Sequence, residues 1–297
     1  MALVDRASEF CESVRDSEGL SCLVSVAWQS TVGLVRSENQ DTLLAGVAPQ
    51  CEAEHHGVMA AVFDGMGGRP GGALASQTAA EVFVNARDKM PGRAPSFSVA
   101  PWLKRTLLEA HRAVCRRGRE EGMRGMGTTA TVLCAHHGQV TIGHVGDTRA
   151  YQLRDGHLTQ LTRDHTMVQA LIDSGKSRKE AIGSGHEGVL LNALGVDGMT
   201  EESFDVIETD LVQGDVLLLS SDGMHEFVSD WQIRQILEEH KRPREAARRL
   251  IRKAYEGVSS DNVSVIVAKI QRSDEMEGEP DRKEMARQEH QVTPKSE

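Results

Sequence analysis

Apolar segments that end at aspartates are the feature that most constrains how this chain can fold. Three such aspartates, each beside a glycine, are Asp64 after segment 58–63, Asp147 after segment 139–145 and Asp222 after segment 216–221. A fourth, Asp261, stands just before the apolar segment 263–270. In an antiparallel sheet, the C-terminal end of one strand lies beside the N-terminal end of its neighbour. All four carboxylates can therefore occupy one edge of such a sheet.

Carboxylates gathered at one edge repel one another strongly unless hard cations lie among them. Ligand sets made only of oxygen favour Mg²⁺ or Mn²⁺, and the lack of nearby histidine and cysteine clusters argues against zinc. Each aspartate-glycine pair taken alone is also typical of an ordinary turn. Their shared position at strand ends favours a metal site, with a set of coincidental turns as the alternative.

The glycine-rich stretch 64–72 is the densest of these signals and reads DGMGGRPGG. Its glycines let the backbone approach a ligand closely and let a carbonyl turn toward a metal. The stretch lacks the Lys-Ser/Thr pair of a nucleotide-binding P-loop and the spacing of a dinucleotide fingerprint. Both of those nucleotide-binding interpretations are therefore excluded.

Hydrophobic periodicity predicts strands and helices that alternate in groups along the chain. The predicted strands are 23–28, 58–63, 129–134, 139–145, 150–154, 216–219 and 263–270. The predicted helices are 73–87, 101–116, 164–174, 230–240 and 244–255, the last of them after Pro243, which suits a first helical turn. Strands grouped in hairpins, with helices between the groups, indicate an α+β fold of antiparallel sheets covered by helices.

The chain of 297 residues is predicted to form one domain over residues 21–270. Residues 1–20 are polar with weak periodicity, which indicates an N-terminal extension with room for a short helix. Residues 271–297 are rich in charge and poor in apolar side chains, so we expect a disordered tail.

Composition limits the partners and the compartment of the protein. The net charge of −10 opposes general binding to nucleic acid. No apolar run approaches the ~20 residues that span a bilayer, and the N-terminus lacks the features of a signal peptide. The five cysteines, an odd number without a CxxC pair, are most simply explained as reduced thiols. We therefore expect a cytoplasmic monomer that binds neither membrane nor nucleic acid.

Five sequence elements, in order, resemble those of the PP2C-type (PPM) metal-dependent protein phosphatases in their bacterial form. They are GLVR at 33–36 with NQD at 39–41, FDGMGG at 63–68, GMGTT at 125–129, VGDTR at 145–149, and SDG at 221–223 with DN at 261–262. Each element is weak alone, but the ordered set is specific and spans essentially the whole predicted domain. The resemblance implies a four-layer αββα sandwich with metal ions in a cleft at one end of the two sheets.

The resemblance also implies a ligand set for two Mn²⁺ or Mg²⁺ ions. Asp64 would bridge the two ions, and the Gly65 carbonyl would ligate one of them. Asp222 and Asp261 would complete the shell of the second ion. Asp147 would serve a third, weaker ion of the kind seen in bacterial relatives.

Two further residues would act on the substrate and the nucleophile. Arg36 would hold the substrate phosphate, because a planar guanidinium can engage two phosphate oxygens at once. Asp41 would hydrogen-bond water held by the ions, and this water, acidified near neutral pH, would attack phosphorus in line. No cysteine lies in a matching loop, which disfavours a cysteine-dependent phosphatase with a covalent intermediate.

The chain departs from the family pattern at several positions. Gln40 replaces the glutamate that is commonest there, and Thr148 replaces the usual serine. Met66 stands where eukaryotic relatives carry a histidine proposed as general acid, and methionine cannot donate a proton. His165 opens residues 164–198, the flap segment, which resembles the mobile flap of the family. It is interpreted either as a proton donor or substrate contact, or as a bystander next to a helix cap at Asp164.

The leading hypothesis is a serine/threonine protein phosphatase that reverses a Ser/Thr kinase, with phosphorylated proteins as its partners. The alternative from another class is a catalytically silent phosphoprotein-binding module on the same fold. Silent relatives would be expected to lose metal aspartates, and none is lost here, so the enzyme is favoured. A third interpretation keeps the enzyme and takes serine phosphate on an anti-sigma-antagonist-type regulator. Because no sensor domain precedes the core, it ranks below the reversal of a kinase.

Overall fold

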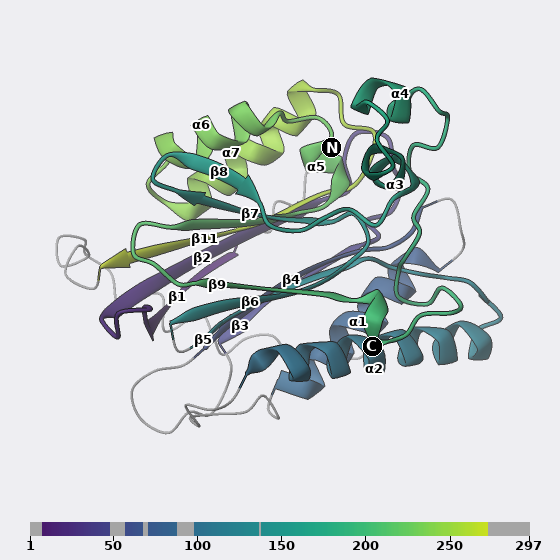
Figure 1. The fold of residues 1–297 in the computed structure, drawn as a ribbon, viewed down its shortest axis with the longest axis horizontal. Coiled ribbons are helices and arrows are strands. Elements are labelled where there is room, and N and C mark those ends of the chain that lie inside the picture. The colour runs from purple at the N-terminus through teal and green to yellow at the C-terminus, as the bar shows by residue number, and fades with distance from the viewer. Residues whose placement is uncertain (1–7, 48–56, 68–70, 88–97, 137, 273–297) are drawn as a thin grey trace, which may run out of the picture.

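Two antiparallel sheets stacked face to face form the centre of the molecule, with helices on both outer faces (Figure 1). The computed structural model describes residues 8–47, 57–67, 71–87, 98–136 and 138–272. The four layers follow the order helices, sheet, sheet, helices, which confirms the predicted αββα sandwich of the α+β class.

The larger sheet has six strands in the order β1-β2-β11-β10-β7-β8. Their bounds are β1 Ser8–Arg15, β2 Ser21–Thr31, β7 Arg149–Arg154, β8 His157–Gln160, β10 Val216–Ser220 and β11 Val263–Arg272. The central strand β10 is buried along its whole length, which explains its continuous apolar sequence.

The smaller sheet has five strands in the order β3-β4-β5-β6-β9. Their bounds are β3 Asp41–Val47, β4 Val58–Asp64, β5 Ala130–His136, β6 Gln139–Val145 and β9 Asp205–Asp210. The sequence patterns predicted β4, β5 and β6 but missed β3 and β9. The edge strand β9 alternates between exposed and half-buried positions and carries acidic residues at both ends, so its local apolar signal is weak.

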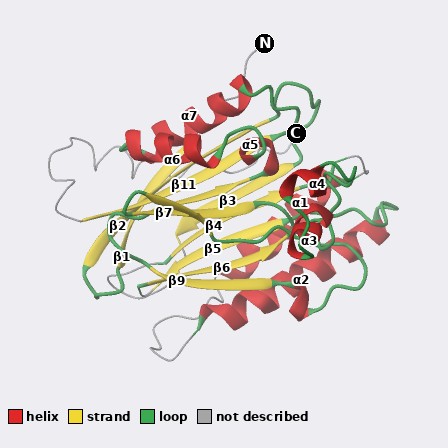
Figure 2. Cartoon of the chain, turned by 45° about the horizontal axis from the view of Figure 1, so that its top comes forward, coloured by secondary structure: helices red, strands yellow, loops and turns green. Residues whose placement is uncertain are grey.

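Helices cover the two sheets on opposite sides (Figures 1 and 2). Helices α1 Gly72–Arg87 and α2 Val99–Glu120 pack on the smaller sheet, whereas α6 Asp230–Glu239 and α7 Pro243–Glu256 cover the larger one. The short helix α5 Asp222–His225 follows β10. Two further helices, α3 Met167–Asp173 and α4 Arg178–Ile182, belong to the flap segment, and η1 Glu201–Ser203 is a single 3₁₀ turn.

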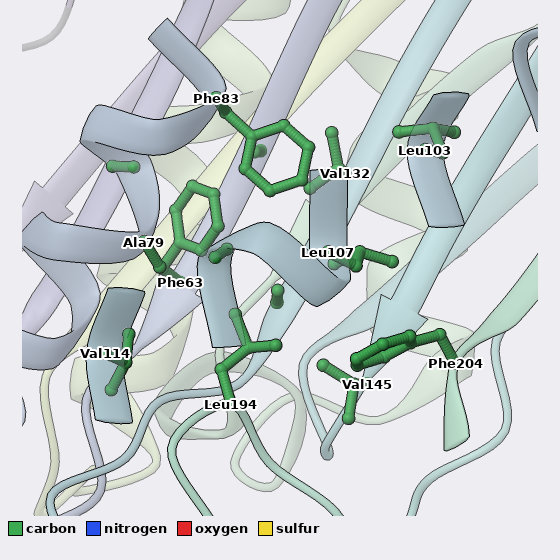
Figure 3. Close-up of a cluster of buried hydrophobic side chains, with 14 of the residues drawn as sticks. Phe63, Ala79, Phe83, Leu103, Leu107, Val114, Val132, Val145, Leu194 and Phe204 are labelled. Atoms are coloured by element: carbon green, nitrogen blue, oxygen red, sulfur yellow. The ribbon is translucent and has the colours of Figure 1, made fainter. Parts of the chain in front are cut away.

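Three apolar clusters hold the layers together. One lies between the two sheets, one beneath α6 and α7, and one beneath α1 and α2. The last of these contains Phe63, Phe83, Val114 and Leu194 (Figure 3). Leu194 comes from the end of the flap segment, so this segment is tied into the core.

The N-terminal residues correct one sequence prediction. Residues 8–20, assigned to an extension, form β1 and the turn that joins it to β2, in full antiparallel register from Ser8 opposite Trp28 to Arg15 opposite Ser21. Phe10 packs edge-on against Trp28, and Val14 is buried. The long partner β2 recruits a strand whose own pattern is weak, so the predicted boundary at residue 20 is too late. Of the predicted tail, residues 273–297 lie outside the described residues.

The helix predicted at 164–174 also begins later than expected. Thr166 is its N-cap and accepts a hydrogen bond from the Gln169 amide, so α3 starts at Met167. Asp164 instead forms an ion pair with Arg149 and caps nothing. The sequence pattern could not reveal this because the partner lies on β7.

The described residues allow two comparisons with the sequence, one for the cysteine thiols and one for membrane-spanning helices. Cys22, Cys115 and Cys134 are free thiols, as predicted for them, and Cys51 lies outside the described residues. Among the helices that the structure describes, none combines the length and apolar character needed to cross a membrane.

Candidate active site

The strand register brings the predicted aspartates to one end of the sandwich. Asp41 at the start of β3 lies opposite Asp64 at the end of β4. Ser220 at the end of β10 lies opposite Val265 near the start of β11, so Asp222 and Asp261 flank the same end of their pair. The antiparallel arrangement expected from the sequence is therefore present in both sheets.

Asp64 and Gly65 are held by their backbone. The Asp64 amide donates to the Thr129 hydroxyl at 3.0 Å, and the Asp64 carbonyl accepts from the Thr128 hydroxyl and the Thr129 amide, each at 2.8 Å. A Cβ on Gly65 would lie 2.4 Å from the Gly72 carbonyl oxygen, so only glycine fits where the loop meets α1. The backbone thus presents the Asp64 side chain from a rigid position.

Several carboxylate oxygens at this site are buried without a partner. Both oxygens of Asp41 and the Oδ1 of Asp222 have no hydrogen bond in the described part of the chain. Buried polar atoms without partners are rare and call for a ligand or ion to satisfy them. These orphaned oxygens and the oxygen-only donor set fit a hard divalent cation.

The described carboxylates do not by themselves form a complete set of metal ligands. No three of the described carboxylate, imidazole or thiol groups are close enough together to enclose an ion as they stand. Mg²⁺ usually keeps several waters and binds through only one or two carboxylates, so a complete cage of side chains is not required.

Burial and mutual repulsion raise the pKa values of these carboxyl groups. Burial raises the pKa of Asp64 and of Asp222 well above the usual value, and neighbouring aspartates raise it further. Burial also raises the pKa of Asp41 to about 6. The Ser264 and Ser221 hydroxyls limit this rise, although neither makes a hydrogen bond of normal geometry to the carboxylate. A cation at the site would relieve a repulsion that the protein leaves uncompensated.

Asp147 belongs to the same group of buried carboxylates, whose charges act on one another, but Asp164 is an additional neighbour of Asp147. Burial, followed by the charge of Asp164, raises the pKa of Asp147 to about 7. The Asp147 charge in turn acts on Asp222 and Asp64. Its neighbour Thr148 is fully buried and shares a hydrogen bond of 2.7 Å with Thr131, so the hydroxyl kept by the Ser-to-Thr departure has a structural role.

Arg149, the first residue of β7, connects the flap segment to residues 146–148, which we call the Asp147 loop. Its Nε donates to Asp164 Oδ1 at 2.9 Å and its Nη2 to Asp164 Oδ2 at 2.6 Å, a bidentate pair with side chains only 14% and 11% exposed. Its Nη1 donates to the Tyr151 hydroxyl at 3.1 Å. A planar fork is needed for this arrangement, which lysine cannot reproduce.

Removal of Arg149 should strongly destabilise the protein. Arg149→Met leaves the Asp164 carboxylate buried without its partner, so we expect the free energy of unfolding to fall by about 3–5 kcal/mol. Urea denaturation measures this. The matched control is Arg234→Met, because the Arg234–Glu238 pair is far more exposed and should contribute less than about 1 kcal/mol. Equal effects of the two substitutions would contradict the assignment.

Arg36 stands over the carboxylates in an exposed loop. Its Nη2 donates to Asp261 Oδ2 at 2.6 Å, and its guanidinium would lie 3.0 Å from a Cβ on Gly67. The hydrogen bond to Asp261 is the main cause of its raised pKa, and the charges of Asp222 and Asp64 add to it. Arg36 is therefore a cation placed at the acidic cluster and accessible to a ligand.

Two departures from the family pattern have definite positions. The Gln40 amide group lies against Gly72, about 3.0 Å from where a Cβ would be, and its backbone carbonyl accepts from the Gly65 amide and the Ser76 hydroxyl. Met66 packs against Gly127, where its sulfur leaves no room for a side chain. Gln40 thus supports the start of α1, and Met66 fills space beside the loop.

His165 has hydrogen-bond partners at both ring nitrogens. Its Nδ1 accepts from the Gly146 amide at 3.3 Å, and its Nε2 lies 3.1 Å from Asp205 Oδ2. Its ring also packs on His144 with centroids 4.9 Å apart. His165 therefore joins residues 146–148 to β9 and is more than a bystander next to a helix cap. Its role as a proton donor or substrate contact stays a prediction.

Two residues near the site have roles that the sequence motifs did not reveal. Glu226 acts on the pKa of Asp147 and of Asp222. It follows Asp222 by four residues, a spacing that places two side chains on one helix face and could have revealed it. Asn262 donates to the carbonyls of Val32 and Glu38, each at 2.9 Å, and so closes the loop that carries Arg36. The sequence placed Asn262 in a motif but could not reveal that its side chain holds the loop of Arg36 through these hydrogen bonds.

The family model described as protein phosphatase 2C matches residues 35–253. This span covers the site residues from Arg36 to Asp222 and most of the sandwich, whereas Asp261 lies beyond it. The chain belongs to the protein phosphatase 2C family. It is therefore a metal-dependent serine/threonine protein phosphatase, as the sequence analysis predicted.

Individual PP2C relatives agree with this assignment. The chain is 32% identical over 237 residues to the serine/threonine phosphatase stp of Listeria monocytogenes, covering 79% of this chain and 91% of that protein. It is 33% identical over 253 residues to the serine/threonine protein phosphatase PstP of Mycobacterium tuberculosis, covering 84% of this chain and 46% of that protein. A crystal structure of the PstP catalytic domain, described as a complex with two manganese ions, superposes with a TM-score of 0.71 at 32% identity, over 84% of this chain and 98% of that chain.

Proposed function

We propose that this PP2C protein hydrolyses phosphoserine and phosphothreonine on proteins at a centre of two Mn²⁺ or Mg²⁺ ions, and that it reverses a Ser/Thr kinase. The observation that carries the proposal is the group of buried aspartates beside Arg36, some of whose oxygens have no hydrogen bond in the part of the chain that the structure describes. The two manganese ions described for the PstP catalytic domain support the same metal content here.

The proposed ligand set divides the aspartates by position. Asp64 would bridge the two ions, with the Gly65 carbonyl on one of them, and Asp222 and Asp261 would hold the second. Asp147 would hold a third, weaker ion. The charge of Asp164, which is the largest charge effect on Asp147 and is not among those that act on Asp64 and Asp222, supports this division.

The bound ions would supply acidified water near neutral pH and positive charge beside the phosphoryl group. Arg36 would leave Asp261 and hold two phosphoryl oxygens through its fork of N–H groups. Asp41, whose two oxygens have no hydrogen bond within the described residues, would accept hydrogen bonds from water at the centre and orient it. The buried surroundings of these groups strengthen every such charge interaction.

The direct test uses the purified protein after chelation and dialysis. Calorimetric titration with Mn²⁺ should give at least two equivalents, and activity toward a phosphothreonine peptide should return with them. One equivalent at full activity would contradict the two-ion centre. Full activity in chelator would overturn the metal mechanism as a whole.

Arg36→Ala should mainly weaken substrate binding. A charge-assisted hydrogen bond contributes about 1.5–3 kcal/mol, so the KM for a phosphothreonine peptide should rise about 10- to 100-fold. The control is Arg117→Ala, which removes an exposed arginine on α2 that forms an ion pair with Glu121. Steady-state kinetics of both variants measure the effect. Unchanged KM and kcat in Arg36→Ala would show that its assigned role is wrong.

A further inference from the structure

The flap segment returns to the sandwich at Leu194 and Gly195, close to the backbone that carries Asp64. Leu194 and Thr128 exchange two backbone hydrogen bonds, of 3.0 and 2.8 Å. The Thr128 hydroxyl also donates to the Asp64 carbonyl at 2.8 Å. A single residue, Thr128, therefore joins the end of the flap segment to the central aspartate.

His111 on α2 holds this returning end from the other side. Its Nδ1 accepts a hydrogen bond from the Gly195 amide at 3.1 Å, and its ring is buried. Its Nε2 lies 3.6 Å from the Cys115 sulfur. Since Nδ1 accepts, the imidazole must be neutral, with its proton on Nε2 and directed toward Cys115.

The contact between His111 and Gly195 is closely packed. Gly195 has a φ of +94°, and a Cβ there would lie 2.3 Å from the Met126 carbonyl oxygen and 2.7 Å from Val114. Leu194 is fully buried in the cluster beneath α1 and α2 (Figure 3). The Gly195 amide therefore has no access to water as a substitute partner while the segment stays in place.

We propose that His111 is a positioning residue of this phosphatase, whose neutral ring anchors the end of the flap segment against Thr128 and Asp64, and that protonation of the ring releases this anchor. The proposal rests on the metal-centre role of Asp64 proposed above. It assigns His111 no contact with substrate or metal.

Protonation removes the acceptor on which the anchor depends. A protonated imidazole carries N–H groups at both nitrogens, so Nδ1 would meet the Gly195 amide donor to donor. The buried Gly195 amide would then lack an acceptor, which costs free energy. Movement of the segment end away from His111 would remove this cost. Only the anchored end is affected directly, because the Leu194–Thr128 hydrogen bonds involve no titrating group.

The charges around His111 agree with an anchor that needs the neutral ring. Burial, followed by the charge of Arg112, lowers the pKa of His111, while Asp197 at the end of the flap segment opposes this. A histidine whose pKa is lowered in the anchored state favours release as the pH falls, because only the released state binds the proton readily. The release should therefore begin below a pH of about 6.5, the ordinary histidine value.

Two substitutions separate this role from simple packing. In His111→Asn, the amide oxygen takes the place of Nδ1 at the same distance from the backbone and cannot be protonated in this pH range. In His111→Leu, the space is filled but no acceptor remains. A residue that only packs would tolerate leucine better than asparagine, whereas an anchor requires the opposite.

The first measurement is hydrogen exchange of the Gly195 amide in chelator, corrected for the intrinsic pH dependence of exchange. Wild-type protection should fall between pH 7.5 and 5.5, protection in His111→Asn should stay level, and His111→Leu should lack protection at both pH values. Constant wild-type protection over this range would overturn the proposal, even if neither variant folded.

The second measurement is kcat/KM for a phosphothreonine peptide with Mn²⁺ over the same range. At pH 7.5, the kcat/KM of His111→Leu should be about tenfold lower than that of the wild type, a modest loss for misplaced catalytic groups. His111→Asn should restore most of it, and the ratio of wild type to His111→Asn should fall toward acid pH. Superimposable pH profiles, or an Asn variant as impaired as the Leu variant, would overturn the positioning role. If Gly195 follows the expected pattern while even wild type is inactive with every divalent ion, the proposed function fails and the anchor stands.

Discussion

Asp64→Ala should lose at least about 10³-fold in kcat/KM toward a phosphothreonine peptide in the presence of Mn²⁺. A catalytic metal centre contributes several kcal/mol of transition-state stabilisation, and each 1.36 kcal/mol is tenfold in rate. Asp64 is the one residue proposed to contact both ions. The charges of Asp41, Asp222, Asp147 and Asp261 all act on its carboxylate, which places Asp64 among these four aspartates.

The same substitution should leave the fold intact or stabilise it when no metal is present. Removing one buried carboxylate relieves repulsion among the others, and the Thr128 and Thr129 bonds to the Asp64 backbone do not depend on its side chain. Thermal unfolding in chelator measures this. The matched control is Asp210→Ala at the end of β9, whose side chain is exposed, with activity near wild type. An Asp64→Ala protein that unfolds in chelator, or that keeps a tenth of the activity, would refute the assignment.

Stability without metal should fall as the pH rises from about 5 to 8, and divalent ions should reverse this trend. Asp41 and Asp147 have pKa values of about 6 and about 7 in the folded chain, against a usual 3.8. Between the usual and the folded values, the folded state binds more protons than the unfolded state. The stability contribution is therefore present below about pH 4 and is lost as the pH rises through 6 and 7. For Asp41 alone, the difference between a pKa of about 6 and the usual 3.8 corresponds to about 3 kcal/mol in the free energy of unfolding.

Chelator and Mn²⁺ provide the two halves of this experiment. In chelator, the melting temperature at pH 8 should lie below that at pH 5, whereas saturating Mn²⁺ should raise it most at pH 8, where the carboxylates are ionised. Asp41→Asn removes one titrating group and should flatten the chelator curve. A melting temperature in chelator that rises from pH 5 to 8 would show that these carboxyl groups are not held in the repulsive state described here.

The fold and the site differ in how far local sequence determines them. The apolar segments before Asp64, Asp147 and Asp222 are buried strands, because a run of apolar side chains has no stable place except inside the sandwich. Strand β9 was not predicted because it is held by pairing with β6, which is distant in sequence. The predicted start of α3 was too early because Asp164 pairs with Arg149 on β7 and the helix is capped by Thr166. Asp164 shows this most clearly, since its partner Arg149 outweighs its local preference for a helix cap.

By itself, the sequence determined which residues could carry the chemistry and that antiparallel strand ends would bring them together, because strand and turn patterns are local properties. Only the tertiary structure decided their state: two Asp41 oxygens with no hydrogen bond from any described residue, Arg36 bound to Asp261, and His165 with partners at both ring nitrogens. It also incorporated β1 into the larger sheet and set His111 against Gly195. These features depend on burial and on hydrogen-bond partners many residues apart, and no local pattern encodes either of them.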